Sequence, residues 1–387
     1  MKDQVLAAIE ALDEPQRTAT TLFYINGYSQ KDIAEFLEIP VTTVNNRLHA
    51  SRSQLKERML TMVEQTIKSN ALPEDFRFTF EAPSRTHTTS PSLVFFQDRW
   101  VMIWQDGKPS EPHDGPFWFL LSTSSDGRTW SEPQRLPIDP QWRCAPQLCV
   151  AGDELLLHTH SHHRGVSVAR TSDLTNWRAG PVLPLGDIGR SGICATGADV
   201  FLVYPRWCSV KRIGDSVDVL RTSDGSSWTW LTSPQPPRGT GITDAACIAR
   251  DGRIYILWRG HENRDGATND VHVDWSDDAG ATWCEPVKIE ALSTTEGSFM
   301  IAPSFGPNGS FVVAQDECRE DGTGRRIMLA VSHDGGKTWS QHAEYTAGGL
   351  VDPAVAFTPD GTLVLAASSR TKDGARSWVI HTRIGAR

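Results

Sequence analysis

The spacing of apolar residues changes once along the chain, near residue 70. Before that point, apolar side chains recur every three or four positions, which is the period of an amphipathic helix. From Phe76 onward, apolar residues alternate with polar ones or form short runs between turns rich in Gly, Asp and Pro, which is typical of strands. We therefore expect a helical domain at residues 1–68, a linker at 69–75 and an all-β domain at 76–387.

Four helices are predicted in the first domain, over residues 5–12, 15–25, 30–37 and about 41–62. Ser29 is a good N-cap for the third helix, and Asp32 completes an approximate capping box. Pro40 separates the third helix from the fourth. The fourth helix carries groups that bind bases and phosphates: Asn45, Asn46, Arg47, His49, Arg52 and Lys56. Two helices joined by a short turn, the second bearing such groups, have the layout of a helix-turn-helix.

Three stretches of this domain carry a resemblance. They are Ala-Leu-Asp-Glu-Pro-Gln-Arg at 11–17, Gly-Tyr-Ser-Gln-Lys-Asp-Ile-Ala-Glu-Phe-Leu at 27–37, and Ile-Pro-Val-Thr-Thr-Val-Asn-Asn-Arg-Leu-His-Ala-Ser-Arg at 39–52. Together they resemble region 4 of sigma-70-type factors of the extracytoplasmic-function group. In that family the last helix binds the −35 promoter element. The DNA-binding residues that the resemblance implies are Thr42, Thr43, Asn45, Asn46, Arg47 and Arg52.

The resemblance implies promoter DNA as a partner, with the RNA polymerase core as a second one. Region 2 of the family, which binds core polymerase and the −10 element, has no counterpart upstream in this sequence. The resemblance therefore does not extend to complete sigma activity. A helical packing domain without a DNA role is the alternative.

One turn recurs five times in the β domain. Residues 276–283 and 332–339 read Ser-x-Asp-x-Gly-x-Thr-Trp, and shorter versions occupy 124–130, 172–177 and 223–228. The closing tryptophans are 47 to 56 residues apart, and such a period indicates a repeat architecture. Asp and Ser side chains hold such a turn by bonding nearby backbone, Gly supplies a positive φ, and Trp buries a large ring.

This turn resembles the Asp-box, or BNR repeat, of sialidase-like β-propellers, where it lies away from the ligand face. Six related inner strands begin near Ser90, Ala145, Ser191, Asp244, Ala302 and Asp352. The expected fold is therefore a helix-turn-helix bundle followed by a six-bladed β-propeller. The last repeat lacks a fourth strand, and we expect residues 76–80 to supply it and close the ring.

Ligands of sialidase-like propellers bind at the centre, near the starts of the inner strands. Sialidases use three arginines, a tyrosine nucleophile assisted by a glutamate, and an aspartate, and are exceptions to the two-carboxylate scheme. Only Arg259 matches an arginine of that set; Ser90 begins the strand where the first arginine is expected. The tyrosine position is occupied by Val351-Asp352, and no arginine stands near Ala302. We therefore do not expect sialidase activity.

Asp244 and Asp352 are the remaining catalytic candidates, because both begin inner strands. They could act as acid and base, accept hydrogen bonds from a bound sugar, or cap the strand entries. The ligand-binding candidates are Asp244, Arg259, Asp352, Arg143 and Arg190, with Trp142 and Glu262 nearby.

A run of histidines raises the question of a metal site. His158, His160 and His162 would share one face of a strand, and imidazole is a common metal ligand. Half-buried or solvated histidines are the alternative, and we expect neither a metal nor a cofactor.

Composition and charge limit the binding partners and the cellular location that we expect for this protein. The net charge of −9 argues against non-specific adhesion of the whole molecule to nucleic acid or membranes. The seven cysteines are odd in number and form no Cys-x-x-Cys pair, which indicates reduced thiols in a cytoplasmic protein. The sequence contains neither an apolar leader nor an apolar run of about 18 residues, so no membrane segment is expected.

These observations favour a DNA-binding transcription regulator whose propeller senses a ligand, such as a glycan, or docks a protein partner. A glycoside hydrolase with an appended helical domain is one alternative. A non-catalytic protein-interaction propeller is the other.

Overall fold

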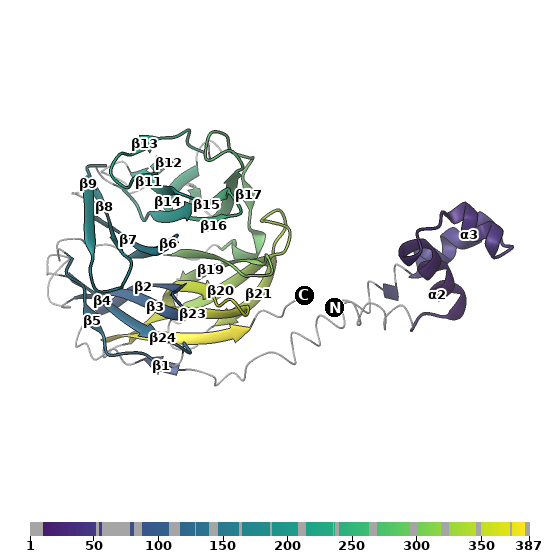
Figure 1. The fold of residues 1–387 in the computed structure, drawn as a ribbon, viewed down its shortest axis with the longest axis horizontal. Coiled ribbons are helices and arrows are strands. Elements are labelled where there is room, and N and C mark those ends of the chain that lie inside the picture. Colours follow the sequence, from purple (N-terminus) through teal and green to yellow (C-terminus); the bar gives the residue numbers. More distant parts are fainter. Residues whose placement is uncertain are drawn as a thin grey trace. The chain divides into compact units, whose positions relative to one another are not determined.

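The computed structural model describes most of the chain as two compact units, which divide between Pro73 and Glu74. The described residues are 11–51, 54–55, 78–80, 87–107, 117–127, 129–138, 146–161, 165–185, 188–207, 214–234, 236, 240–262, 269–294, 300–318, 325–345, 350–371 and 374–383. Figure 1 shows a small helical unit and a larger unit built of strands.

The helical unit begins with α2 (Glu14–Thr20), which continues into a π-helical turn, η1 (Thr21–Ile25). α3 (Gln30–Phe36) follows, and a further helix covers residues 41–51. Ser29 caps α3 as the sequence predicts. Its Oγ accepts a hydrogen bond from the backbone N–H of Asp32 (3.2 Å), and the Asp32 carboxylate accepts one from the backbone N–H of Ser29 (3.1 Å).

The core of the helical unit joins all three helices. Ala19 of α2, Ile33 and Ala34 of α3, and Val44 and Leu48 of the helix at 41–51 are at most 7% exposed. Val44 and Leu48 are four positions apart, so they lie on one face and fix that helix against its neighbours. The predicted helix at 5–12, and the last predicted helix beyond residue 55, lie largely or wholly outside the described residues.

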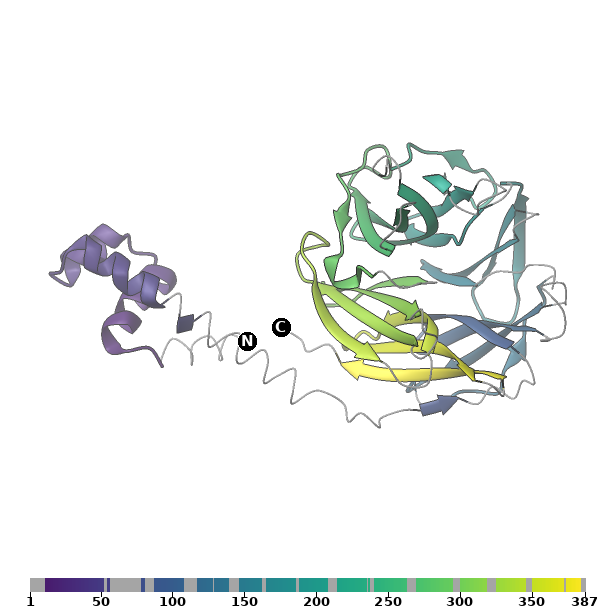
Figure 2. The ribbon, with the colours of Figure 1, turned by 180° about the vertical axis from the view of Figure 1, so that it is seen from behind.

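The β unit contains, within its described ranges, four sheets of four strands and one of eight (Figures 1 and 2). The first two sheets are β2 (His87–Phe96), β3 (Arg99–Gly107), β4 (Phe117–Ser124) and β5 (Gln134–Arg135), then β6 (Gln147–Ala151), β7 (Glu154–Ser161), β8 (Gly165–Thr171) and β9 (Arg178–Leu183). The eight-stranded sheet comprises β10 (Gly192–Thr196), β11 (Asp199–Trp207), β12 (Gly214–Thr222), β13 (Thr229–Trp230), β14 (Thr240–Arg250), β15 (Arg253–Glu262), β16 (Asn269–Ser276) and β17 (Val287–Lys288).

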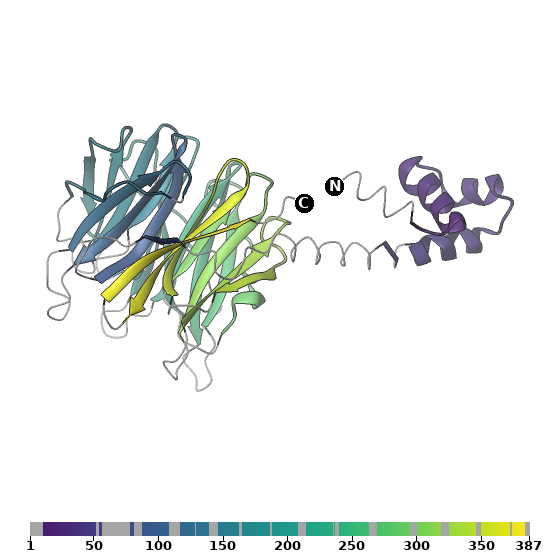
Figure 3. The ribbon, with the colours of Figure 1, turned by 90° about the horizontal axis from the view of Figure 1, so that it is seen from below.

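The remaining sheets complete the propeller. After the 3-10 turn η2 (Glu290–Leu292) come β18 (Ile301–Phe305), β19 (Phe311–Cys318), β20 (Arg325–Ser332) and β21 (Ser340–Tyr345). The last sheet holds β22 (Leu350–Phe357), β23 (Thr362–Thr371), β24 (Gly374–Arg383) and β1 (Phe78–Phe80). Figure 3 shows the same sheets from below the view of Figure 1.

The prediction of six separate blades is wrong, because the described strands form five sheets. The eight-stranded sheet combines two successive sequence repeats, β10–β13 and β14–β17. They are joined by a single residue pair between β12 and β14, Gly214 with Ile242. Counting repeated turns could not reveal this pairing, because neither residue belongs to a repeated turn.

The ring closes through the first strand of the β unit. β1 pairs antiparallel with β24, with Phe78 opposite Val379 and Phe80 opposite Ser377. The first and last strands of the unit therefore share one sheet, as the sequence predicts. This pairing covers the edge that β24 would otherwise leave open.

The repeated turns have the hydrogen bonds that their sequence predicts. The Asp278 carboxylate accepts bonds from the backbone N–H (2.8 Å) and the hydroxyl (2.6 Å) of Thr282. Asp334 accepts the equivalent bonds from Thr338, at 2.9 and 2.6 Å. Gly280 has a φ of 88°, a conformation that favours glycine. The hydrogen bonds from the Thr282 side chain and backbone lower the pKa of Asp278 to about 2.

Apolar layers fill the seams between neighbouring four-strand units. In the seam between β14–β17 and β18–β21, for example, Leu257, Phe311 and Val313 are fully buried. Such interdigitating layers are the usual core of packed sheets. Among the described residues, none of the helices is long and apolar enough to cross a membrane.

Candidate functional site

The two ends of the strands in each four-strand unit carry different chemistry. Because neighbouring strands run antiparallel, the start of an inner strand lies beside the end of the second strand, and the repeated turns lie at the opposite end of the strands. In β14 and β15, Asp244 pairs with Arg259 toward one end of the strands. At the other end Arg253 forms an ion pair (2.6 Å) with Asp277 of a repeated turn. The turns are therefore remote from Asp244.

The end of the strands opposite the turns holds a set of buried polar side chains, which we call the polar end of the propeller. They belong to the starts of inner strands and the ends of second strands: Gln105, His158, His160, Ser191, Asp244, Arg259, Gln315, Asp316, Glu317, Asp352 and Ser368. All are at most 6% exposed. Polar groups are buried at a free-energy cost unless they find partners, so this concentration makes the polar end the candidate site of the β unit.

Four of the five predicted ligand-binding residues lie together there. Arg259 forms a buried ion pair with Asp244, and Arg190 lies 3.5 Å from the Asp352 carboxylate. The two pairs are linked by the backbone, because the Arg190 carbonyl accepts a hydrogen bond (3.0 Å) from the N–H of Ala245. The fifth residue, Arg143, lies outside the described residues, as does Trp142, and the side chain of Glu262 is not described.

Asp316 is a member of this cluster that the sequence did not single out. It is fully buried on β19, and its carboxylate accepts hydrogen bonds from the backbone N–H groups of Met300 (2.7 Å) and Asp352 (3.2 Å). Asp352 has a φ of 53°, which is strained for a residue other than glycine. Asp316 therefore helps to hold Asp352 in an unusual conformation. A polar triplet, Gln315 to Glu317, directly after an apolar strand was the available signal.

The histidines of β7 have a partner that the sequence did not predict. His158 and His160 are fully buried, and their ring nitrogens lie 3.1 and 3.3 Å from the hydroxyl oxygen of Ser191. Burial lowers the pKa of His158 to about 3, which keeps that imidazole neutral. Both histidines are therefore buried and hydrogen-bonded to Ser191, whereas we expected half-buried or solvated side chains. Within the described residues no three His, Cys, Asp or Glu side chains gather in a metal-binding group, and His162 lies outside those residues.

Asp274 is a buried carboxyl group on β16, in the strand next to β15. The Trp258 indole N–H donates a hydrogen bond to it, and the same indole stacks on His272 with ring centroids 4.2 Å apart. Burial raises the pKa of Asp274 from 3.8 to about 7. The folded protein therefore holds a proton on Asp274 that the unfolded chain loses above about pH 4.

Asp274→Asn should stabilise the protein at high pH only. Because folding raises the pKa of Asp274, the contribution of this group to the free energy of unfolding is intact below about pH 4 and is lost as the pH rises through 7. Asn remains neutral and can still accept from Trp258, so we expect a gain on the order of 2 kcal/mol at pH 8 and almost none at pH 4. Thermal unfolding at both pH values measures this. Asp251→Asn, at a side chain that is 87% exposed, is the control. An equal gain from Asp274→Asn at both pH values would contradict the assignment.

The helix at 41–51 presents the predicted DNA-binding residues on its outer face. Thr42, Asn45 and Asn46 are exposed, and Thr43 and Arg47 are half-buried. The opposite face carries the core residues of the helical unit. Arg52, the sixth predicted DNA-binding residue, lies outside the described residues.

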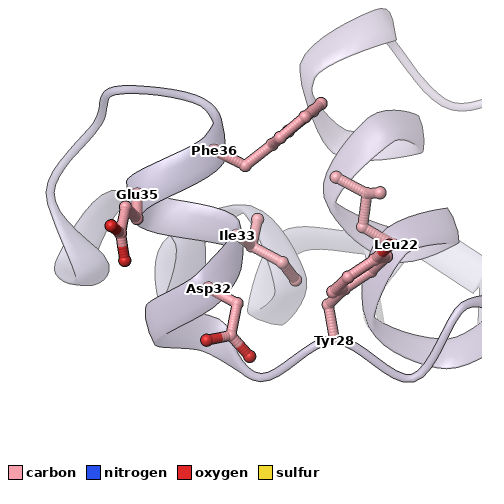
Figure 4. Close-up of a pocket in the computed structure, with 6 residues that line it drawn as sticks. All are labelled: Leu22, Tyr28, Asp32, Ile33, Glu35 and Phe36. Carbon is pink, nitrogen blue, oxygen red and sulfur yellow. The ribbon is translucent and has the colours of Figure 1, made fainter.

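A second surface of the helical unit is apolar. Tyr24, Ile25 and Tyr28 are 51 to 53% exposed, and Phe36 is 75% exposed. A pocket of about 330 Å³ lies in this region and is lined by Leu22, Tyr28, Asp32, Ile33, Glu35 and Phe36. Figure 4 shows Phe36 and Tyr28 on its apolar walls, with the carboxylates of Asp32 and Glu35 to one side. Large exposed apolar groups in so small a unit indicate a contact surface.

Comparison with known proteins gives one family match near the N-terminus and a set of similar solved structures. Residues 2–55 match the family described as sigma-70, region 4. None of the curated proteins matches the chain.

Three similar solved structures each cover about four fifths of this chain. An α-L-arabinanase of Penicillium chrysogenum, complexed with arabinobiose, is 14% identical, over 79% of this chain and 98% of that one, with a TM-score of 0.59. The endosialidase of phage phi92 is 11% identical, over 80% and 69%, with a TM-score of 0.61. The sialidase of Trypanosoma rangeli is 13% identical, over 80% and 57%, with a TM-score of 0.52. At these identities the likeness establishes the fold. The chain thus joins a segment similar to sigma-70 region 4 to a propeller of the sialidase-like fold.

Proposed function

We propose that this protein is a cytoplasmic DNA-binding transcription regulator, with a helix-turn-helix domain at residues 1–68 and a ligand-sensing or partner-docking propeller at 76–387. The observation that carries the proposal is the match of residues 2–55 to sigma-70 region 4. The outer face of the helix at 41–51 supports it, because Asn45, Asn46 and Arg47 offer the groups that read adenine, guanine and phosphate. Its target is a −35-like promoter element, as in the extracytoplasmic-function group.

The apolar surface around the pocket of the helical unit is the proposed contact for the RNA polymerase core. Tyr28 and Phe36 belong to the segment around α3, whereas the DNA-facing residues belong to the helix at 41–51. The two surfaces therefore use different residues, and one protein contact and one DNA contact are compatible.

The glycoside hydrolase is the second candidate function, because arabinanases and sialidases share the propeller fold. Asp244 and Asp352 would be its carboxylates. Both, however, already form ion pairs, Asp244 with Arg259 and Asp352 with Arg190, so neither carboxylate is free for a reacting group. Turnover of a fluorogenic arabinoside or sialoside by the full chain, lost in both Asp244→Asn and Asp352→Asn, would favour the enzyme over the sensor and over a purely protein-binding propeller.

Arg47→Ala should weaken promoter binding about 5- to 150-fold, because one arginine contact to a base or phosphate contributes about 1–3 kcal/mol. The measurement starts with selection of duplexes from a randomised library by the full chain. Fluorescence anisotropy of a selected duplex, titrated at several salt concentrations, then gives the affinity and its salt slope. A phosphate contact would reduce the slope by about one, whereas a base contact would relax the selected sequence.

The control for this experiment is Lys337→Ala, which removes one exposed positive charge from a repeated turn of the propeller. It changes the net charge as Arg47→Ala does but leaves the helix at 41–51 intact. Equal affinities for wild type and Arg47→Ala, or equal losses in both variants, would refute the proposed DNA contact.

A further inference from the structure

The charges at the polar end are already paired, which limits the ligands that this site would accept. Three of its four buried carboxylates form ion pairs, Asp244 with Arg259, Asp352 with Arg190 and Glu317 with Arg326. The fourth, Asp316, accepts hydrogen bonds from the backbone N–H groups of Met300 and Asp352. A carboxylate ligand is normally held by a free arginine fork. Here it would have to displace Asp244 or Asp352 and leave that carboxylate buried without its partner.

Several buried polar groups of the polar end have no hydrogen-bond partner among the described residues, and two of them lie on strands that face one another across the seam between β14–β17 and β18–β21. They are the Nε–H of Arg259 and the side-chain amide of Gln315, both of whose polar atoms are unsatisfied. Arg259 is 6% exposed and Gln315 is fully buried. Buried polar groups of this kind are normally paired with protein, water or ligand, so the pattern indicates that something polar completes the site.

Strand alternation places these two groups in the same seam. Leu257 of β15 and Val313 of β19 pack in one apolar layer between the two four-strand units. Side chains two positions apart on a strand share a face, and here β15 is in regular register with β16 and β19 with β20; the bulge beside Arg259 lies on β14. Arg259 lies two residues beyond Leu257, and Gln315 lies two residues beyond Val313. Both side chains therefore lie in the same seam, at the polar end of the propeller.

We propose that this end of the seam binds an uncharged, polyhydroxylated ligand, a neutral sugar, through Arg259 and Gln315. The Arg259 Nε–H donates, and the Gln315 amide both donates and accepts, which suits a hydroxyl that does the same. Asp244 and Asp352 remain paired with their arginines and accept from further hydroxyls. The inference rests on the proposed sensor role of the propeller.

The test uses the full chain on an array of oligosaccharides in which each neutral glycan is paired with its sialylated form, followed by calorimetry on the glycans bound. We expect at least a tenfold preference for the neutral member. Gln315→Met, which keeps the shape and removes the amide, should weaken binding at least tenfold. Gln341→Met, at an exposed glutamine on β21, should leave it unchanged.

Preference for sialylated glycans, binding of no glycan, or full affinity in Gln315→Met would overturn the inference; in the last case the amide is completed by water. DNA affinity measured with and without the bound glycan separates this idea from the regulatory one. Sugar binding with unchanged DNA affinity upholds the neutral-sugar site and refutes regulation through it. Normal DNA binding without any glycan binding refutes the sugar site alone.

Discussion

Replacing residues 76–82 with a Gly-Ser segment of equal length should lower the melting temperature of the β unit on the order of 10 °C. The replaced segment contains β1, which supplies the strand that pairs with β24 and closes the ring. Without it, β24 becomes an open edge, and the last sheet loses a quarter of its strands. A loss of several kcal/mol corresponds to such a shift in a domain of this size. Thermal unfolding followed by tryptophan fluorescence measures it.

The equal length keeps the connection to the helical unit intact, so a change in stability reports the strand and not the tether. A soluble peptide covering residues 76–82, added to the variant, should restore part of the lost stability, because binding to the folded form alone is stabilising. An unchanged melting temperature would mean that the pairing with β24 contributes nothing to closure.

Local patterns in the sequence predicted most of the fold. The capping box at Ser29 and the repeated turns at Asp278 and Asp334 depend on residues within four positions of each other, so their hydrogen bonds could be read directly. The closing role of residues 76–80 followed from one missing strand in a regular series. The merging of two repeats through Gly214 and Ile242 was not predictable, because it depends on how two units meet in space.

The candidate site was predicted only in part for the same reason. Asp244 and Asp352 were chosen because they begin inner strands, and Arg259 because it ends a second strand and matches a sialidase arginine. Arg190 was chosen because it lies near a predicted loop on the same face, and all of these positions are visible in the sequence. The pairing of Arg190 with Asp352, 162 residues away, and of Arg259 with Asp244, 15 residues away, was not visible in the sequence. Asp316 and Gln315 were missed because a polar residue at the end of a strand is ordinarily solvated, and their burial depends on the neighbouring unit.

Arg259→Met should be among the most destabilising substitutions at the polar end, at about 3–5 kcal/mol, because it leaves the buried Asp244 carboxylate without its partner. Both side chains of this pair are only 8% exposed, so water cannot readily take the place of the guanidinium. Combining Arg259→Met with Asp244→Asn removes the charge as well, and the double variant should recover a substantial part of the loss. Urea unfolding of the two single variants and the double variant completes the cycle.

The matched control lies on the same strand. Arg253→Met breaks the ion pair with Asp277, whose side chain is 64% exposed, and a surface pair of this kind contributes at most about 1 kcal/mol. A loss several times larger for Arg259→Met would establish that the polar end is dry and its charges mutually dependent. Equal losses in the two variants would mean that water screens Asp244, in which case its pairing with Arg259 would no longer restrict the site to uncharged ligands.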